Sequence, residues 1–186
     1  MNPAVGVDYS ATQVYLTVVN EEVMASITLI LPTDDSGKLA FFQNVIEVLE
    51  SWDNEFGLPY LWIEQPFVNG KFPRPGMLIQ RMATFLEIAS LQALISPVFV
   101  HPGTWRKRLF DNGKPKDAKE RAIAHVEEVL HYELPTLGKT ARAKNKDHNF
   151  ADSACIAHYG HLMQKENSVF NSSGEEIWSL DNPKTG

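Results

Sequence analysis

The sequence predicts a single α/β domain with a mixed five-stranded sheet flanked by helices, and two observations support this fold class. The chain has 186 residues, of which 44% are hydrophobic and 22% are charged, so it can bury one sizeable core. Three β-rich runs come first, and helical and β-rich segments then alternate, which is the order of a layered α/β domain. A single cysteine, Cys155, excludes a disulfide framework and a zinc site built from several thiolates.

The predicted strands begin with an antiparallel meander. Short polar breaks separate the first three β-rich runs, which is typical of strands joined by tight turns. Two later runs are short, apolar and bounded by proline or polar residues, and they complete the sheet. The five predicted strands are 4–9, 13–19, 23–31, 60–64 and 97–101.

Four helices are predicted from apolar residues that recur at helical spacing. Two of them begin with helix-capping patterns, either a run of Asp and Ser or an Asp followed by a Glu three residues later. The last helix carries many small residues, which indicates close packing. The predicted helices are 38–52, 77–95, 117–132 and 151–163.

The second of these helices, 77–95, is apolar almost all round, so it needs cover on more than one side. Either it lies between the sheet and a second subunit, which predicts a homodimer, or it is buried within one chain. No repeat or linker divides the sequence, so we expect residues 1–163 to form one domain and residues 164–186 a polar tail.

No run of 18 apolar residues occurs, and the N-terminus lacks the pattern of a signal peptide. The sequence therefore predicts a soluble protein of the cytoplasm that does not associate with membranes.

Charge is distributed unevenly along the chain. The formal net charge is −6, yet residues 103–146 hold 11 of the 17 Lys and Arg residues and only six acidic ones. A basic segment on an acidic body is what a polyanionic ligand would select, although a solvated surface explains the charge alone equally well. Within this segment Trp105 either contributes an aromatic surface to a basic patch or anchors the segment to the core.

Three carboxylates occupy positions where apolar residues are expected. Asp8 and Glu64 each close an apolar strand at its C-terminal end, the usual edge for functional sites in α/β sheets. Asp152 lies on a helix face that otherwise looks packed. Buried carboxylates are paired or hold a metal, and a set of oxygen ligands suits Mg²⁺ or Mn²⁺. The sequence therefore predicts a site for hard cations that could cleave a phosphodiester.

The segments around these carboxylates resemble one known family. Val5-Gly6-Val7-Asp8, Trp62-Ile63-Glu64-Gln65-Pro66-Phe67 and Phe150-Ala151-Asp152-Ser153-Ala154 are similar to motifs of the RuvC family of Holliday junction resolvases, within the RNase H-like superfamily. The order of elements agrees from about residue 4 to residue 163. The resemblance implies a divergent, homodimeric, Mg²⁺-dependent endonuclease that cuts four-way DNA junctions, with Mn²⁺ as a substitute cation.

The resemblance also implies a ligand set. Asp8, Glu64 and Asp152 match three metal ligands of the family. The fourth position, three residues before Asp152, is normally Asp or His and is Asn149 here. An amide oxygen can bind Mg²⁺ but is neutral and a poorer base. If the loop shifts, Asp147 or His148 takes this place instead.

Residues that contact DNA are predicted from the family resemblance and from the charge pattern. Phe67 matches a family aromatic that stacks on an unpaired base, and Arg106 and Lys119 match basic residues near the metals and the phosphates. Lys116 and Lys119 flank a helix N-terminus, where the helix dipole disfavours cations unless an anion binds there. Lys107 completes the predicted DNA-binding set.

Two alternatives to a junction endonuclease stay open at this point. A different RNase H-like nuclease, acting on branched DNA, RNA or RNA–DNA hybrids, would share the same acidic site. A non-catalytic junction-binding module is favoured by Asn149, because loss of a ligand removes activity and leaves the fold intact.

Overall fold

The computed structural model describes residues 3–66, 73–110, 118–136 and 146–173 of the chain. The strands are β1 (Ala4–Tyr9), β2 (Gln13–Asn20), β3 (Glu22–Ile30), β4 (Tyr60–Glu64) and β5 (Ser96–Val100). The helices are α1 (Asp35–Phe56), α2 (Pro73–Gln92), α3 (Pro102–Phe110), α4 (Ala118–Glu128) and α5 (His148–Ser173).

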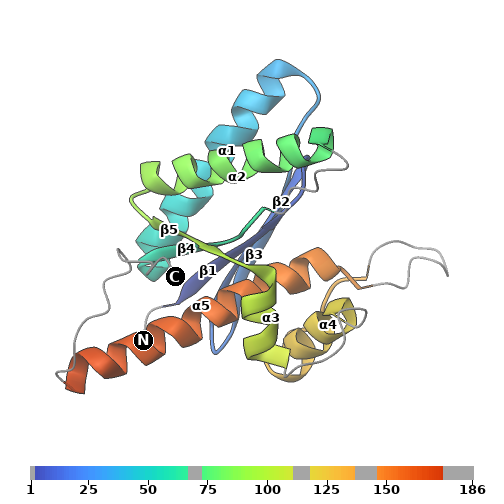
Figure 1. Cartoon of the computed structure of the whole chain (residues 1–186). Helices are drawn as coiled ribbons and strands as arrows, with labels where there is room; N and C mark the ends of the chain where they lie inside the picture. The colour runs from blue at the N-terminus through green and yellow to red at the C-terminus, as the bar shows by residue number, and fades with distance from the viewer. Residues whose placement is uncertain (1–2, 67–72, 111–117, 137–145, 174–186) are drawn as a thin grey trace.

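The strands form one mixed sheet in the order β3-β2-β1-β4-β5. β1, β2 and β3 pair antiparallel, as predicted for the meander, whereas β4 pairs parallel with β1 and β5 pairs parallel with β4. Helices α1 and α2 cover one face of the sheet, and α3, α4 and α5 lie on the other (Figure 1). The predicted fold class, a mixed five-stranded sheet between helices, is confirmed.

Successive side chains of the central strands point to opposite faces of the sheet and contribute to two separate hydrophobic cores. Val5 and Val7 of β1 pack with Leu61 and Ile63 of β4 under α1 and α2. The residues between them face the other way, and Trp62 joins the core under α3, α4 and α5. Because a strand presents successive side chains to opposite faces, Asp8 and Glu64 fall on the α5 side of the sheet.

The helix α5 lies unusually close to β1. A Cβ atom added at Gly6 would stand 2.2 Å from the backbone nitrogen of Ala157 and 2.3 Å from the carbonyl oxygen of Ser153. The hydroxyls of Thr17 and Ser153 form a buried hydrogen bond of 2.7 Å between β2 and the same helix. Glycine on the strand therefore fixes the height of α5 above the sheet, and with it the position of Asp152.

The predicted strands agree with the structure to within one residue at each end, but the helices differ more. α1 extends to Phe56 and ends at Gly57, which adopts a left-handed conformation with φ 66°. α2 ends before Leu94, whose φ of 60° turns the chain out of the helix. α3 was not predicted, because it is short and its one fully buried side chain, Trp105, gives no helical period.

The last helix also departs from the prediction. α5 continues to Ser173 instead of ending at residue 163, because no proline or glycine follows Met163 until Gly174 and Gln, Lys and Glu favour helices. The division into a domain of residues 1–163 and a polar tail of residues 164–186 stays a prediction. Within the described part of the chain, no helix combines the length and hydropathy needed to cross a membrane.

Candidate functional site

The parallel pairing of β1 and β4 brings two of the predicted carboxylates together. Val7 is the register partner of Ile63, so Asp8 and Glu64, each one residue further on, lie side by side at the C-terminal ends of adjacent strands. On the other side of β1, Asp8 is the register partner of Tyr15 in β2. The carboxylates therefore stand in the middle of the sheet and not at its edge strands.

The third carboxylate, Asp152, belongs to α5, which packs over the ends of these strands. Its neighbour Ser153 faces the sheet and is fully buried, and Asp152 itself is only 8% exposed. The close approach of α5 to Gly6 leaves Asp152 near enough to Asp8 that its charge disfavours ionisation of Asp8. The structure thus brings Asp8, Glu64 and Asp152 together from three elements.

The surroundings of the three carboxylates disfavour their ionised forms, so the pKa of each is raised. Burial raises the pKa of Asp8 well above its ordinary value, and the charges of Asp152 and Glu64 raise it further. Burial raises the pKa of Asp152 to about 7, against the opposing effect of Arg106. The pKa of Glu64 is also raised by burial. Such a cluster of like charges at low solvent exposure is typical of a site that binds a cation or handles protons.

Helix α3 supplies the positive charge that faces this cluster. The Arg106 guanidinium lies 3.6 Å from a carboxylate oxygen of Asp152 and 3.8 Å from one of Glu64. It also stacks over the indole of Trp105, with 4.7 Å between the guanidinium carbon and the ring centroid. Trp105 is fully buried, so the anchoring role is the correct one of the two alternatives for this residue.

Two further groups position Glu64. The indole Nε1–H of Trp105 donates to Oε2 of Glu64 over 3.1 Å. The hydroxyl of Tyr9 donates to the backbone carbonyl of Glu64 over 2.9 Å. Neither contact was predicted, and no local pattern signals them, because the partners lie 41 and 55 residues apart in the sequence.

The fourth predicted ligand position lies in the segment 147–149, whose three residues make different contacts. The amide Nδ2 of Asn149 donates to the hydroxyl of Tyr15 over 3.3 Å, at the strand position opposite Asp8. Asp147 caps α5, since its Oδ1 accepts from the backbone nitrogens of Asn149 and Phe150. The imidazole of His148 lies 2.9 Å from Nζ of Lys119. Asn149 is therefore the residue of this segment that lies beside the β1–β2 pair, and Asp147 already has a structural role.

No group of three or more His, Cys, Asp or Glu side chains among the described residues is arranged to hold a metal ion as it stands. The indole of Trp105 and the guanidinium of Arg106 lie beside Oε2 of Glu64, and the guanidinium also lies beside one carboxylate oxygen of Asp152. The donor set itself, three carboxylates with oxygen ligands only, fits Mg²⁺ or Mn²⁺. The raised pKa values show that the three ionised carboxylates are unfavourable in this site, and a bound cation would offset the repulsion between their charges.

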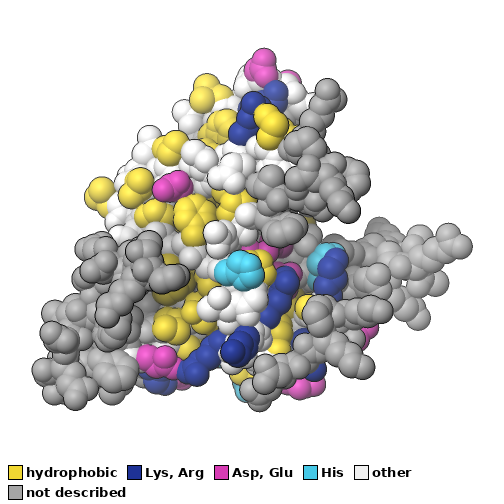
Figure 2. Space-filling view, in the orientation of Figure 1, with side chains coloured by type: hydrophobic (Ala, Val, Ile, Leu, Met, Phe, Trp, Pro, Cys, Tyr) yellow, Lys and Arg dark blue, Asp and Glu magenta, His cyan; other side chains and the backbone are white. Residues whose placement is uncertain are grey.

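Two of the predicted DNA-binding residues, Arg106 and Lys119, lie close to this cluster. Lys107 is exposed on α3, and Lys119 is exposed in the first turn of α4, where its charge lowers the pKa of Asp152. Figure 2 shows Lys and Arg side chains gathered over α3 and the start of α4, next to acidic and histidine side chains. Phe67 and Lys116 lie outside the described residues.

Comparison with known proteins identifies the fold class first. No family model matches the sequence, and no curated protein matches it either. The structure, however, has the fold of RuvC-type Holliday junction resolvases, in a divergent form with low sequence identity.

Three solved structures carry this comparison. T. thermophilus RuvC in complex with a Holliday junction substrate superposes with a TM-score of 0.63 and 13% identity, covering 94% of this chain and 97% of that one. A second Thermus thermophilus RuvC structure gives a TM-score of 0.57 and 11% identity, covering 91% of this chain and 95% of that one. The yeast mitochondrial Holliday junction resolvase Ydc2 gives a TM-score of 0.55 and 12% identity, covering 91% of this chain and 81% of that one.

Proposed function

We propose that this protein is a divalent-metal-dependent endonuclease that cleaves four-way DNA junctions. The observation that carries the proposal is the convergence of Asp8, Glu64 and Asp152 at the C-terminal ends of β1 and β4, inside a RuvC-like fold. A resolvase of this fold in complex with a junction substrate supports the choice of substrate.

Asp8, Glu64 and Asp152 would hold the cations, and Asn149 is the candidate for a fourth, neutral ligand. Mg²⁺ or Mn²⁺ bound there would supply an activated water and a countercharge for the leaving oxygen. Trp105 keeps one oxygen of Glu64 oriented through its 3.1 Å hydrogen bond, which leaves the other oxygen available as a ligand.

The basic side chains would bind the DNA backbone. Arg106 sits between the carboxylates and solvent with its side chain 34% exposed, so it can turn from the carboxylates to a phosphate when a cation takes its place. Lys119, whose charge acts on Asp152, and Lys107, which is exposed on α3, would contact neighbouring phosphates. Phe67 and Lys116 complete this interface as sequence-based expectations only.

The proposed active species is a homodimer, because a junction offers two equivalent strands to cut. Helix α2 and the turn that follows it present exposed apolar side chains, with Ile88 and Leu91 of the helix 52% and 57% exposed and Leu94 of the turn 91% exposed. A second copy covering this surface would remove apolar area from water and place two sites on one junction. The expected cytoplasmic location follows from the substrate and stays a prediction.

The test is a cleavage assay on a synthetic four-way junction with each strand labelled in turn. We expect paired symmetric nicks that require Mg²⁺ or Mn²⁺, disappear in EDTA and disappear in Asp8→Asn, while linear duplex is left intact. Asp8→Asn should still bind the junction, because phosphate contacts supply most of the affinity. Cleavage by Asp8→Asn at the wild-type rate would contradict the assignment of the site.

One observation favours a second candidate, a junction-binding module without nuclease activity. The amide of Asn149 is engaged by Tyr15, and a neutral residue stands where the family has a charged or basic ligand. Selective junction binding with no cleavage in either metal would support this candidate, and Asn149→Asp would then be expected to confer cleavage. Preferred cleavage of flaps or RNA–DNA hybrids would point to another RNase H-like nuclease.

A further inference from the structure

The hydroxyl of Tyr15 connects strand β2 to the candidate fourth ligand of the site. It accepts a hydrogen bond from Nδ2 of Asn149 over 3.3 Å. We propose that Tyr15 is a positioning residue, which fixes the amide of Asn149 so that its oxygen Oδ1 is the atom offered to a divalent cation. The inference rests on the proposed function and deepens it, because it explains how a neutral amide can stand in for a charged ligand.

The two partners of this hydrogen bond both lie next to carboxylates of the site. Asn149 precedes Asp152 by three residues in α5, and side chains at this spacing share one face of a helix, with Cβ atoms about 5–6 Å apart. Tyr15 is the register partner of Asp8 in the antiparallel β1–β2 pair, so these two side chains share one face of the sheet. The hydrogen bond therefore joins α5 to the sheet beside Asp8 and Asp152.

A second hydrogen bond sets the direction of the first. The hydroxyl of Tyr15 donates to Oε1 of Gln13, which lies two residues earlier in β2, over 3.0 Å. A tyrosine hydroxyl carries one proton, so while it donates to Gln13 it can only accept from Asn149. Only the NH₂ group of an amide can donate, because the amide oxygen has no proton. Asn149 must therefore turn its nitrogen towards Tyr15 and its oxygen away.

Other contacts hold both partners in place. Tyr15 is only 7% exposed and belongs to the core under α3, α4 and α5. Asn149 is half-buried in the first turn of α5, and its backbone nitrogen donates to Oδ1 of Asp147 over 3.1 Å. The orientation of the amide thus depends on one rotation of the Asn149 side chain, and the Tyr15 hydroxyl selects between its two outcomes.

The choice between these outcomes matters for an amide and not for a carboxylate. An asparagine offers one oxygen to a cation, whereas an aspartate offers two equivalent ones. Of the hydrogen bonds among the described residues, none involves Oδ1 of Asn149, so this oxygen is available as a ligand. Groups that orient a metal ligand typically change metal affinity 10- to 100-fold when they are removed.

The experiment titrates the full-length protein with Mn²⁺ alone, in the absence of DNA, and measures free Mn²⁺ by electron paramagnetic resonance. We expect the wild-type protein to bind Mn²⁺ and Asp8→Asn to bind much less, which assigns the ion to the carboxylates. Tyr15→Phe should weaken Mn²⁺ binding about tenfold. In junction cleavage it should raise the half-saturating Mn²⁺ concentration by a similar factor and leave the maximal rate nearly unchanged.

A double substitution separates orientation of the amide from a general effect on the fold. In an Asn149→Asp background either carboxylate oxygen can bind the cation, so adding Tyr15→Phe should change the Mn²⁺ affinity very little. Melting temperatures in EDTA establish that all variants are folded. An equal loss of affinity in both backgrounds would make the positioning role wrong, because the hydroxyl would then act through the fold.

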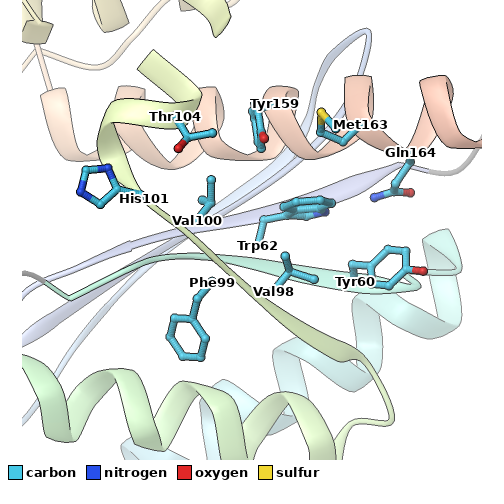
Figure 3. A pocket seen from close by; sticks show the side chains of 10 residues that line it. All are labelled: Tyr60, Trp62, Val98, Phe99, Val100, His101, Thr104, Tyr159, Met163 and Gln164. Atoms are coloured by element: carbon cyan, nitrogen blue, oxygen red, sulfur yellow. The ribbon is translucent and has the colours of Figure 1, made fainter. Parts of the chain in front are cut away.

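Tyr60→Phe is the matched control, because it removes the same hydroxyl from the same face of the sheet. Tyr60 begins β4, at the end of the strand away from Glu64, and it lines a separate pocket together with Trp62 (Figure 3). Its Mn²⁺ affinity should equal that of the wild type. If Tyr15→Phe also binds Mn²⁺ like the wild type, the positioning role is wrong and the proposed function stands. If the wild type binds no more Mn²⁺ than Asp8→Asn, the proposed metal site itself fails.

Discussion

The indole of Trp105 donates a hydrogen bond to Oε2 of Glu64 over 3.1 Å, and so joins the first turns of α3 to the end of β4. Trp105 is fully buried and Glu64 has a side chain 22% exposed, so the bond forms largely away from bulk water. The next residue of α3, Arg106, lies 3.8 Å from the same oxygen. Two adjacent residues of one short helix thus hold and partly neutralise a carboxylate of the proposed catalytic site.

We expect Trp105→Phe to lower the cleavage rate about tenfold and the stability by about 1–2 kcal/mol, since an oriented carboxylate oxygen loses its donor while most of the packing remains. Single-turnover junction cleavage and urea unfolding measure the two effects. Trp52→Phe, a half-buried residue of α1, is the control and should leave the rate unchanged. An unchanged rate in Trp105→Phe would remove the positioning role.

Asp152 should make the folded protein less stable as the pH rises, whereas a carboxylate with a lowered pKa makes it more stable. Because the pKa of Asp152 is raised to about 7, its contribution to stability is present at acid pH and is lost as the pH rises from about 4 through 7. In EDTA, Asp152→Asn should therefore be more stable than the wild-type protein at pH 8, by on the order of 2 kcal/mol more than at pH 5. Urea unfolding at both pH values measures this, and a pH-independent difference would contradict it.

Removal of the guanidinium should make the protein depend more on divalent cations. In Arg106→Gln the carboxylates lose the charge that faces them, so we expect a lower melting temperature in EDTA than for the wild-type protein. Added Mg²⁺ should raise the melting temperature of this variant by more than that of the wild type, because no cation of the chain competes for the oxygens. Arg81→Gln, exposed on α2, is the control. Equal Mg²⁺ effects in all three proteins would show that Arg106 does not occupy the cation position.

The contact between β1 and α5 makes Gly6 sensitive to any side chain. Gly6→Ala would bring a methyl group to 2.2 Å from backbone atoms of α5, so the helix must move. We expect a loss of about 3 kcal/mol or more, with loss of cleavage as Asp152 shifts. Gly57→Ala, at a left-handed helix end with open space around it, should cost only about 1 kcal/mol. A similar loss of unfolding free energy in Gly6→Ala and Gly57→Ala would mean that α5 can move away from β1 without destabilising the fold.

The apolar surface of α2 predicts self-association. If α2 mediates a dimer, the wild-type protein should sediment as a dimer at micromolar concentration, and Leu91→Glu should sediment as a monomer. Met24→Glu is the control, because Met24 is 44% exposed on β3, the edge strand opposite β5, and α2 packs against β5, β1 and β4. A wild-type monomer at that concentration would make the predicted homodimer wrong.

The sequence by itself determined the features that depend on local periodicity. Runs of β-forming and apolar residues located the strands to within a residue, and they placed Asp8 and Glu64 at strand ends because each run stops there. Helical spacing also put Asp152 on the packed face of the last helix, where the residue is 8% exposed. An apolar run and a helical spacing of 3.6 residues can each be detected in a short window of sequence.

Tertiary structure decided which of these residues meet. The parallel pairing of β1 with β4 brought Asp8 beside Glu64, and the glycine contact at Gly6 set Asp152 above them. The contacts of Trp105 with Glu64 and of Asn149 with Tyr15 join residues 41 and 134 positions apart. No short window encodes such pairs, because they depend on strand order and on the height of a helix above the sheet. The chemical types of the site residues were therefore set locally, while the site itself was assembled by the packing of distant elements.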